Sequence, residues 1–362
     1  MLKWLLFPFS LLYGFIVSFR NILFDYNFLN SHEFDVPVLS VGNITVGGTG
    51  KTPHVEYIVD LLNKEFNVAT LSRGYKRKSK GFVLASENST VKDIGDEPKQ
   101  IKKKFPDIHV AVDNNRVHGI KKLLSKKIET IIDVIILDDA FQHRYVKPGF
   151  SILLIDFNQP LSNDHLLPLG RLREHAHEKR RANLILITKS PNELKPIERR
   201  IIVKDLKLFP YQTLYFTTYK YGNLIPVFNN DNVIDNEKLK NKSYSVLVIT
   251  GIAKYKPFVQ YIKTFSNDIH HIGFPDHHYF TKKDINKILN KFNDISNPNK
   301  IIITTEKDSV RFYETSYKNL IEESPIFYIP IEIDFLNEDK ENFNKLITNY
   351  IRSNKRKIKN IF

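Results

Sequence analysis

The N-terminal part of the chain alternates short apolar runs with amphipathic stretches of helical spacing. Continuous apolar runs are typical of strands that are buried on both faces of a parallel sheet. These runs are Val36–Val41, Val68–Ser72, Val110–Val112, Val134–Leu137, Ile152–Ile155 and Leu184–Thr188. A helix is predicted at His54–Glu65, directly after the first run. The alternation predicts an α/β fold in which helices cover both faces of a mostly parallel sheet.

The pattern changes near residues 205–240. Gln212–Tyr221 is aromatic and β-branched, and Asn229–Asn232 indicates a loop. A second α/β alternation follows, with strands predicted at Tyr244–Thr250, Ile301–Thr304 and Ile326–Ile329 and a helix at Pro257–Phe265. We therefore expect an apolar anchoring helix at residues 1–24, a core domain at 25–210, a strand-like linker at 211–240 and a smaller α/β domain at 241–362.

The first residues indicate contact with a membrane. Trp4–Phe19 carries no charge and lies between Lys3 and Arg20. A full crossing needs about 20 apolar residues, so the segment either crosses at a tilt or lies at the interface with Trp4, Phe7 and Tyr13 as anchors. A buried first helix is the remaining alternative. The sequence leaves these alternatives open.

Charge and composition narrow the function classes. Lys and Arg number 54 against 40 Asp and Glu, and this surplus of +14 favours an anionic partner. The apolar N-terminus favours lipid over nucleic acid as that partner. The chain has no cysteine, which excludes disulfides, thiolate metal sites and cysteine nucleophiles.

The segment Val38–Pro53 predicts a phosphate-binding loop. A buried strand leads into a glycine-rich turn, and Gly50-Lys51-Thr52 opens a helix, so that backbone N–H groups can cradle phosphate oxygens. Thr45 departs from the usual pattern, which has glycine at that position. The candidate ATP-binding residues are Thr45, Val46, Gly47, Gly48, Thr49, Gly50, Lys51 and Thr52.

A second element of this chemistry is the pair Asp138-Asp139, which ends the predicted strand Val134–Leu137. In enzymes with a phosphate-binding loop, a carboxylate at such a strand end holds Mg²⁺ beside the hydroxyl of the loop. Thr52, Asp138 and Asp139 are therefore the candidate Mg²⁺ ligands.

Several motifs in one order resemble a known family, the tetraacyldisaccharide 4′-kinases. They are V-G-N-I-T-V-G-G-T-G-K-T-P, L-S-R-G-Y, G-D-E-P, L-D-D-A-F-Q-H-R, L-P-L-G-R-L-R-E and F-P-D-H-H-Y-F. The resemblance covers the chain from the N-terminal segment to the second domain. It implies a phosphate-loop kinase that moves the γ-phosphate of ATP to the 4′-hydroxyl of an acylated glucosamine disaccharide 1-phosphate at the cytoplasmic face of a bacterial inner membrane. It implies neither nucleic acid nor an obligate protein partner.

The resemblance also assigns roles to residues. Asp96 would be the catalytic base and Lys51 would neutralise charge on the phosphates. A histidine of Asp276-His277-His278 would orient Asp96, and we favour His277 while His278 stays open. From the residues alone, Asp96 also fits a helix N-terminus ahead of Pro98. The candidates for binding the disaccharide and its phosphate are Arg73, Tyr75, Glu97, Arg116, Gln142, His143, Arg171 and Glu174.

Other classes share some of these features. A membrane-associated ATPase switch would need the loop but no sugar-lipid acceptor. A GTPase is suggested by Ile187-Thr188-Lys189-Ser190, but Pro191 replaces the carboxylate that would bind guanine. A nucleic-acid binder would use the positive charge, yet the sequence contains no recognition module. We therefore expect a lipid kinase.

Overall fold

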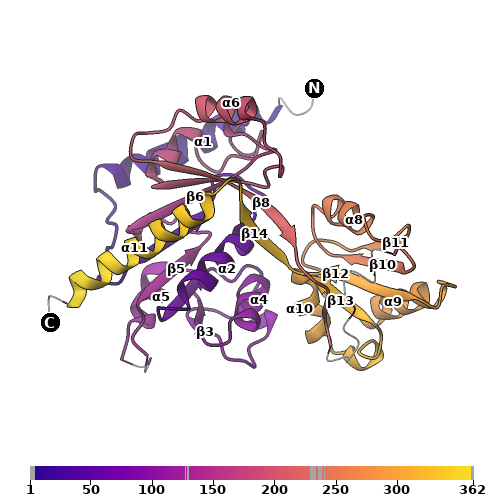
Figure 1. Ribbon diagram of the computed structural model, residues 1–362. Helices are drawn as coiled ribbons and strands as arrows, with labels where there is room; N and C mark the ends of the chain where they lie inside the picture. The colour runs from indigo at the N-terminus through magenta and orange to yellow at the C-terminus, as the bar shows by residue number, and fades with distance from the viewer. Residues whose placement is uncertain are drawn as a thin grey trace.

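The computed structural model describes residues 5–126, 128, 130–228, 234, 239 and 241–359, which form two sheets (Figure 1). The larger sheet has nine strands in the order β14-β8-β7-β6-β1-β5-β2-β4-β3. Its strands are β1 (Val38–Gly42), β2 (Val68–Ser72), β3 (Val83–Leu84), β4 (His109–Val112), β5 (Val134–Asp138), β6 (Phe150–Asp156), β7 (Leu184–Thr188), β8 (Thr213–Tyr221) and β14 (Ile331–Phe335). The antiparallel pairs are β3 with β4 and β14 with β8, at the two edges. The predicted mostly parallel sheet is confirmed.

Helices cover both faces of this sheet. Its associated helices are α1 (Phe7–Asp25), α2 (Lys51–Leu62), α3 (Val91–Ile94), α4 (Asp96–Lys104), α5 (Arg116–Leu123), α6 (Pro196–Leu206) and α11 (Asp339–Lys359), with short 3₁₀ turns at Leu161–Asn163 and Ala176–Arg181. The core on one face joins α2, α4 and α11 to alternate strand residues such as Leu39 and Ile136. The residues between them, such as Leu137 and Leu153, pack under α5 and α6 on the other face. This alternation is the expected result of strands buried on both sides.

The smaller sheet has five strands in the order β11-β10-β12-β13-β9. Its elements are β9 (Ile225–Pro226), β10 (Ser245–Thr250), β11 (Asp268–Gly273), β12 (Lys300–Thr305), β13 (Ile326–Ile329), α8 (Lys256–Ile262), α9 (Lys282–Asn293), α10 (Glu306–Glu314) and a 3₁₀ turn at Lys318–Leu320. Helices α9 and α10 pack on one face and α8 on the other. The expected loop Asn229–Asn232 lies outside the described residues.

Two neighbouring strands connect the sheets. Strand β8 of the larger sheet leads to β9 of the smaller one, and β13 returns through Pro330 to β14, which pairs with β8 (Figure 1). The sequence analysis expected a linker at 211–240 and a second domain at 241–362. The pairing of the strands suggests other boundaries. Residues 213–221 pair within the larger sheet, and β14 and α11 pack on it as well. We propose that residues 222–330 form the smaller unit and that the rest of the described chain forms the larger one.

Helix α1 packs on the larger unit with its polar side inward. Its buried residues include Ser10, Gly14 and Asn21. Most of its large apolar side chains are exposed, with Phe15 at 69% and Phe9 at 61%, whereas Phe24 is buried. A helix in the core of a soluble protein has the opposite arrangement. By length and composition α1 is able to cross a membrane, but Trp4, one of its expected anchors, lies outside the described residues.

Candidate active site

The phosphate-binding loop connects β1 to α2. Gly47 and Gly50 have φ angles of 108° and 89°, a conformation that side chains with a Cβ rarely adopt. A Cβ on Gly50 would also lie 2.1 Å from the hydroxyl of Tyr219. The glycines therefore give the chain a sharp turn that leads directly into the N-terminus of α2, where helix N–H groups attract anions.

The departure from the usual loop pattern at Thr45 has a structural reason. Residues 44–46 pair with the segment 171–173: the N–H of Val46 donates to the carbonyl of Arg171 at 2.8 Å, and the N–H of Arg173 donates to the carbonyl of Ile44 at 2.7 Å. Thr45 and Leu172 form an antiparallel bridge. Thr45 thus has extended, strand-like pairing that requires no glycine, and the L-P-L-G-R-L-R-E motif supports the loop from one side.

Lys51 lies at the start of α2 with its ammonium between polar groups. Its Nζ is 3.3 Å from Oδ1 of Asn43 and 3.5 Å from Oδ1 of Asp139. Arg173 also donates to Asp139, at 3.1 and 3.3 Å to its two oxygens. Burial raises the pKa of Asp139, but Lys51 and Arg173 outweigh burial and hold the pKa below its usual value. The charged carboxylate of Asp139 therefore orients the ammonium of Lys51 before a nucleotide binds.

Asp138 has a different environment from Asp139. It pairs in register with Val41, next to the start of the loop. Burial and then the charge of Asp139 raise the pKa of Asp138 to about 7. Its Oδ1 is buried and has no hydrogen-bond partner in the described part of the chain. A hard divalent cation is the natural partner for such an oxygen, so the donor set of Asp138, Asp139 and the Thr52 hydroxyl fits Mg²⁺.

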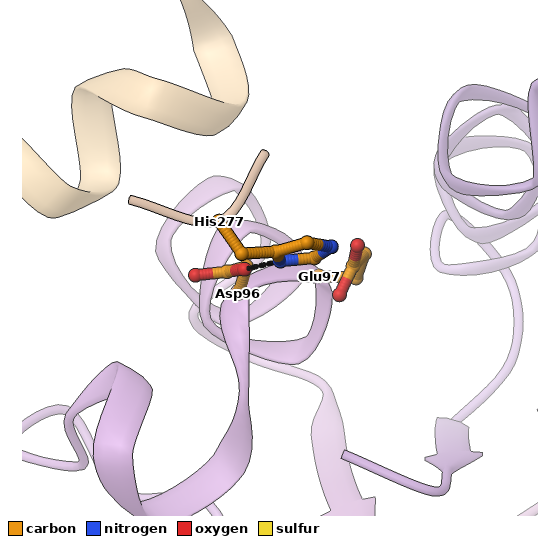
Figure 2. A group of neighbouring side chains, drawn as sticks. All are labelled: Asp96, Glu97 and His277. Carbon is orange, nitrogen blue, oxygen red and sulfur yellow. Dashed lines mark hydrogen bonds and ion pairs between the residues drawn. The ribbon is translucent and has the colours of Figure 1, made fainter. Parts of the chain in front are cut away.

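The G-D-E-P motif forms the start of α4 and contributes a second group of polar side chains. The ligand atoms of Asp96, Glu97 and His277 lie within 4.8 Å of one another (Figure 2). His277 comes from the smaller unit, in the segment between β11 and α9, whereas Asp96 and Glu97 belong to the larger one. The predicted partnership of Asp96 with the D-H-H segment is therefore a contact between the two units.

Two side chains of the smaller unit, Arg311 and His277, contact the carboxylate of Asp96. It is 2% exposed, and Arg311 of α10 donates from Nε to Oδ1 at 2.7 Å and from Nη2 to Oδ2. Nδ1 of His277 also contacts Oδ2. Burial raises the pKa of Asp96, but the hydrogen bonds from His277 and Arg311 outweigh burial and lower the pKa below its usual value. Asp96 is therefore a charged, buried carboxylate.

The structure distinguishes the adjacent histidines. His277 adopts a left-handed conformation, with φ 64°, and contacts Asp96. His278 contacts Oδ2 of Asp284 at 2.9 Å and stacks on Phe274. The geometry thus favours His277 over His278 as the partner of Asp96.

Asp96, Glu97 and His277 also have the composition of a metal site, but the surrounding charges oppose it. The Arg311 fork occupies both Asp96 oxygens. The ammonium of Lys307 is 3.1 Å from Oε1 of Glu97 and 3.2 Å from Nε2 of His277. A cation placed here would meet two positive groups that already neutralise the carboxylates. Asp138, whose buried Oδ1 has no partner in the described part of the chain, is the better candidate for a metal ligand.

The L-S-R-G-Y and G-D-E-P motifs contact each other through their glycines. Gly74 and Gly95 have φ angles of 67° and 92°. A Cβ on Gly95 would lie 3.1 Å from the backbone of Gly74 and Tyr75. This approach places the ring of Tyr75 against that of His277, with centroids 5.2 Å apart. On the other side, the charge of Glu97 contributes to the raised pKa of Asp138. The loop, the Asp138 edge and the Asp96 group are therefore neighbours.

The residues expected to bind the substrate fall into three groups. Arg73 and Tyr75 are exposed, where an incoming molecule can reach them, and the Tyr75 ring lies against His277. The half-buried candidates are Glu97, Gln142, His143 and Arg171. Gln142 donates to the carbonyl of Asn43 at 2.8 Å, and Arg171 donates to Asp164 at 2.8 Å. Burial, followed by nearby arginines, lowers the pKa of His143 to about 4.

Arg116 and Glu174 do not fit direct substrate contact in this structure, because each is 1% exposed. Arg116 donates to the carbonyl of Asp113 at 2.6 Å and to that of Asp138 at 3.4 Å, so it supports the strand end that carries the carboxylates. Glu174 pairs with Arg181. We therefore propose that these two residues support the site from within, beside the residues that face it.

Four residues of the site were not identified from the sequence: Asn43, Arg173, Lys307 and Arg311. Asn43 and Arg173 lie inside recognised motifs, and their positions next to Lys51 and Asp139 were the available signal. Lys307 and Arg311 lie on α10, where no motif was recognised. They reach the site only because α10 packs against α4.

A buried histidine beneath the loop gives a prediction for stability. Nδ1 of His54 contacts the carbonyl of Gly50 at 2.7 Å, and Nε2 contacts Oγ1 of Thr217 at 2.9 Å. Burial lowers the pKa of His54 to about 4. Because the unfolded chain binds a proton near pH 6.5 and the folded chain does not, stability falls as the pH falls from about 6.5 to 4, by roughly 3 kcal/mol from this group.

His54→Gln should therefore make the free energy of unfolding less dependent on pH across this window. Denaturant unfolding at several pH values from 4 to 7 measures the effect. Exposed His32 provides the control, because His32→Gln should retain the pH dependence of the unchanged chain. The interpretation is contradicted if His54→Gln has the same pH dependence as the unchanged protein.

Comparisons with known proteins agree with this geometry. A family model described as tetraacyldisaccharide-1-P 4′-kinase matches residues 2–352. Tetraacyldisaccharide 4′-kinase of Phocaeicola vulgatus is 48% identical over 354 residues, which cover 98% of this chain and 96% of that protein. The protein of the same name from Bacteroides thetaiotaomicron is 48% identical over 362 residues, which cover 98% of this chain and 94% of that protein. The crystal structure of LpxK from Aquifex aeolicus in complex with ATP has a TM-score of 0.76 and 31% identity, and the match covers 97% of this chain and 100% of that one.

Proposed function

This chain belongs to the tetraacyldisaccharide-1-phosphate 4′-kinase family, and from that membership we propose how its residues perform the reaction. The activity is transfer of the γ-phosphate of ATP to the 4′-hydroxyl of a tetraacyldisaccharide 1-phosphate, a step of lipid A biosynthesis. The alternative of an ATPase switch without a sugar-lipid acceptor is not favoured. Two observations carry the proposal: Asp96 contacts His277, and Lys51 of the phosphate-binding loop contacts Asp139.

ATP binds through the loop in this proposal. The phosphate-binding loop and the N-terminus of α2 hold phosphate oxygens, and Lys51 compensates their negative charge. Asn43 and Asp139 keep the ammonium of Lys51 oriented before ATP arrives. Asp138, Asp139 and the Thr52 hydroxyl would hold Mg²⁺. That ion would neutralise charge on the phosphates when bound.

The acceptor hydroxyl loses its proton to the Asp96–His277 pair. The oxygen forms a bond to the γ-phosphorus, the bond between this phosphorus and the bridging oxygen breaks, and ADP leaves. An ionised carboxylate has about four acceptor positions, and the contacts with Arg311 and His277 occupy three of them. Asp96 is 2% exposed, so the acceptor hydroxyl would enter beside Arg311 and His277 and use the acceptor position that remains.

We assign the disaccharide to the surface formed by Arg73, Tyr75, Gln142, His143 and Arg171. Arginine suits the 1-phosphate, because its guanidinium pairs with phosphate oxygens in a bidentate way. Tyr75 supplies a ring next to His277, where the reacting sugar would lie. Arg116 and Glu174 support this surface from within.

The direct test is transfer of labelled phosphate from ATP to the acylated disaccharide 1-phosphate. Product carrying label at the 4′ position supports the proposal. ATP hydrolysis at an equal rate with and without the sugar lipid, with no labelled lipid, would support the ATPase switch instead.

We further propose that α1 lies flat on the inner membrane rather than crossing it. Ser10 donates to the carbonyl of Leu166 at 2.8 Å, Tyr13 to that of Arg173 at 2.9 Å, and Arg20 to that of Gln142 at 2.8 Å. These bonds fix the polar side of α1 to loops of the site and direct its apolar side outward. The acyl chains would remain in the bilayer while the sugar enters the site.

Substitution of Phe15 and Phe19 by Glu should weaken binding to lipid vesicles and leave ATP affinity unchanged. Both rings are exposed, and each contributes roughly 1.5–3 kcal/mol when fully buried in an apolar environment, so a loss of at least about tenfold is expected. Vesicle sedimentation and nucleotide titration measure the two quantities. Ile131→Glu is the control, since Ile131 is exposed outside α1. Unchanged sedimentation of the double variant would contradict the proposal. Surface variants are preferable to deleting α1, which would remove its hydrogen bonds to the loops.

A further inference from the structure

We propose that Arg311 is a positioning residue of the phosphate-transfer site, holding the Asp96 carboxylate and the His277 segment in the relative orientation that the reaction requires. This inference rests on the proposed role of Asp96. Arg311 lies on α10 of the smaller unit and Asp96 on α4 of the larger one, 215 residues apart in sequence. Both side chains are 2% exposed.

The guanidinium contacts both members of the Asp96–His277 pair. Nε and Nη2 bind the two oxygens of Asp96 as a fork, the geometry in which arginine recognises a carboxylate most specifically. Nη1 donates to the carbonyl of His278 at 2.8 Å, next to His277 in the chain. One planar group therefore fixes the carboxylate and the backbone that carries its histidine partner.

The hydrogen-bond partners of His277 also favour one tautomer of its ring. Nε2 of His277 lies 3.2 Å from the ammonium of Lys307, which can only donate. Nε2 must then accept, and Nδ1 carries the proton that is donated to Asp96. A charged Asp96 stabilises this tautomer. His277 and Arg311 together hold the pKa of Asp96 below its usual value despite burial, so Arg311 also acts on His277 through the carboxylate.

Several ionisable groups surround Asp96, and each bears on a pH experiment. They are Arg311, Lys307 and Glu314 on α10, His277 and Tyr279 in the segment before α9, and Glu97 on α4 itself. Arg311 is the group among them that binds both carboxylate oxygens. Burial favours the neutral form of the Asp96 carboxyl, and Arg311 opposes this effect. Removal of Arg311 should therefore raise the pKa of Asp96.

The test compares Arg311→Gln and Arg311→Lys in the labelled transfer assay across pH. Arg311→Gln should lower kcat about 100-fold, the cost of a misplaced catalytic group, with the KM for ATP little changed. The acid limb of its kcat profile should move to higher pH by about one unit or more. Arg311→Lys keeps the charge but loses the fork, so kcat should fall about tenfold, while the acid limb stays near that of the unchanged enzyme.

Lys99→Gln is the matched control. Lys99 also connects α4 with α10, through an ion pair at 3.8 Å with Glu314, but it does not bind Asp96. It should leave kcat and the acid limb unchanged. If Arg311 only joined the units, its variants would lose thermal stability and active fraction without any movement of the acid limb, and that result would overturn the inference. Normal kcat in Arg311→Gln would overturn it as well.

Arg311→Gln removes one partner of a buried ion pair and so risks failure to fold. Arg311→Lys then decides alone: a kcat close to that of the unchanged enzyme, with ATP bound normally, would refute the need for the fork. Asp96→Asn in the same assay separates the two proposals. An active Asp96→Asn would refute the role of Asp96 itself, whereas an inactive Asp96→Asn beside a fully active Arg311→Gln would refute only the role of Arg311.

Discussion

Asp96→Asn should lower kcat for phosphate transfer by about 10³-fold, within the range of 10²–10⁴ that general acid–base catalysis contributes. The amide accepts no proton at neutral pH, and its NH₂ group would face the donors of Arg311 instead of an acceptor. ATP affinity should change little, because Asp96 lies on α4 and the nucleotide binds at the loop before α2. Single-turnover transfer and nucleotide titration measure the two effects separately.

A second Asp–His pair in the same segment supplies the control. Asp284 contacts His278 much as Asp96 contacts His277, but it lies at the start of α9. Asp284→Asn should cost some stability through the loss of its helix cap and should leave kcat within about threefold of the unchanged enzyme, far from the loss that a general base causes. Equal losses in both variants would argue against a special role for Asp96.

Lys51→Met should lower kcat by about 10²–10³-fold, the loss expected when a preorganised charge that stabilises the transition state is removed. Its Nζ lies at the start of α2 beside Asp139, where the phosphates would bind. ATP affinity should fall as well, because the lysine neutralises the bound phosphates as well as the transition state. Steady-state kinetics at saturating ATP separate the two contributions.

Lys64 is the control for this variant. It follows α2 at its other end and forms an exposed ion pair with Asp60 at 3.0 Å, and pairs of this kind contribute little. Lys64→Met should therefore retain full activity. Lys51→Met with a normal kcat would mean that the loop does not hold the reacting phosphate.

The sequence predicted the central strands well, for a physical reason. Strands β2, β7 and β13 have the bounds expected from their apolar runs, because strands buried on both faces need apolar residues at every position. Strand β14 was missed. It is short and carries the polar residues Glu332 and Asp334, and no local feature indicates that it returns to the larger sheet. The expected division of the chain followed sequence order, whereas the division that we propose follows strand pairing across distant segments.

The expected site residues are those that lie in recognised sequence motifs. The phosphate loop, Asp138, Asp139 and the contact of Asp96 with His277 all involve residues in recognised motifs. The charged residues of α10 were not predicted, because Arg311 in isolation resembles any helix arginine. Burial also could not be predicted. Arg116 and Arg73 look alike in sequence, yet one is buried beneath Asp138 and the other is exposed.

The central claim is that a phosphate held by the loop of the larger unit faces the Asp96–His277 pair between the two units. A crystal structure with a non-hydrolysable ATP analogue, Mg²⁺ and the disaccharide 1-phosphate tests this most directly. We expect the γ-phosphate beside Lys51, with the 4′-hydroxyl between it and Asp96. Nucleotide bound away from residues 45–52, or a hydroxyl directed away from Asp96, would contradict the account.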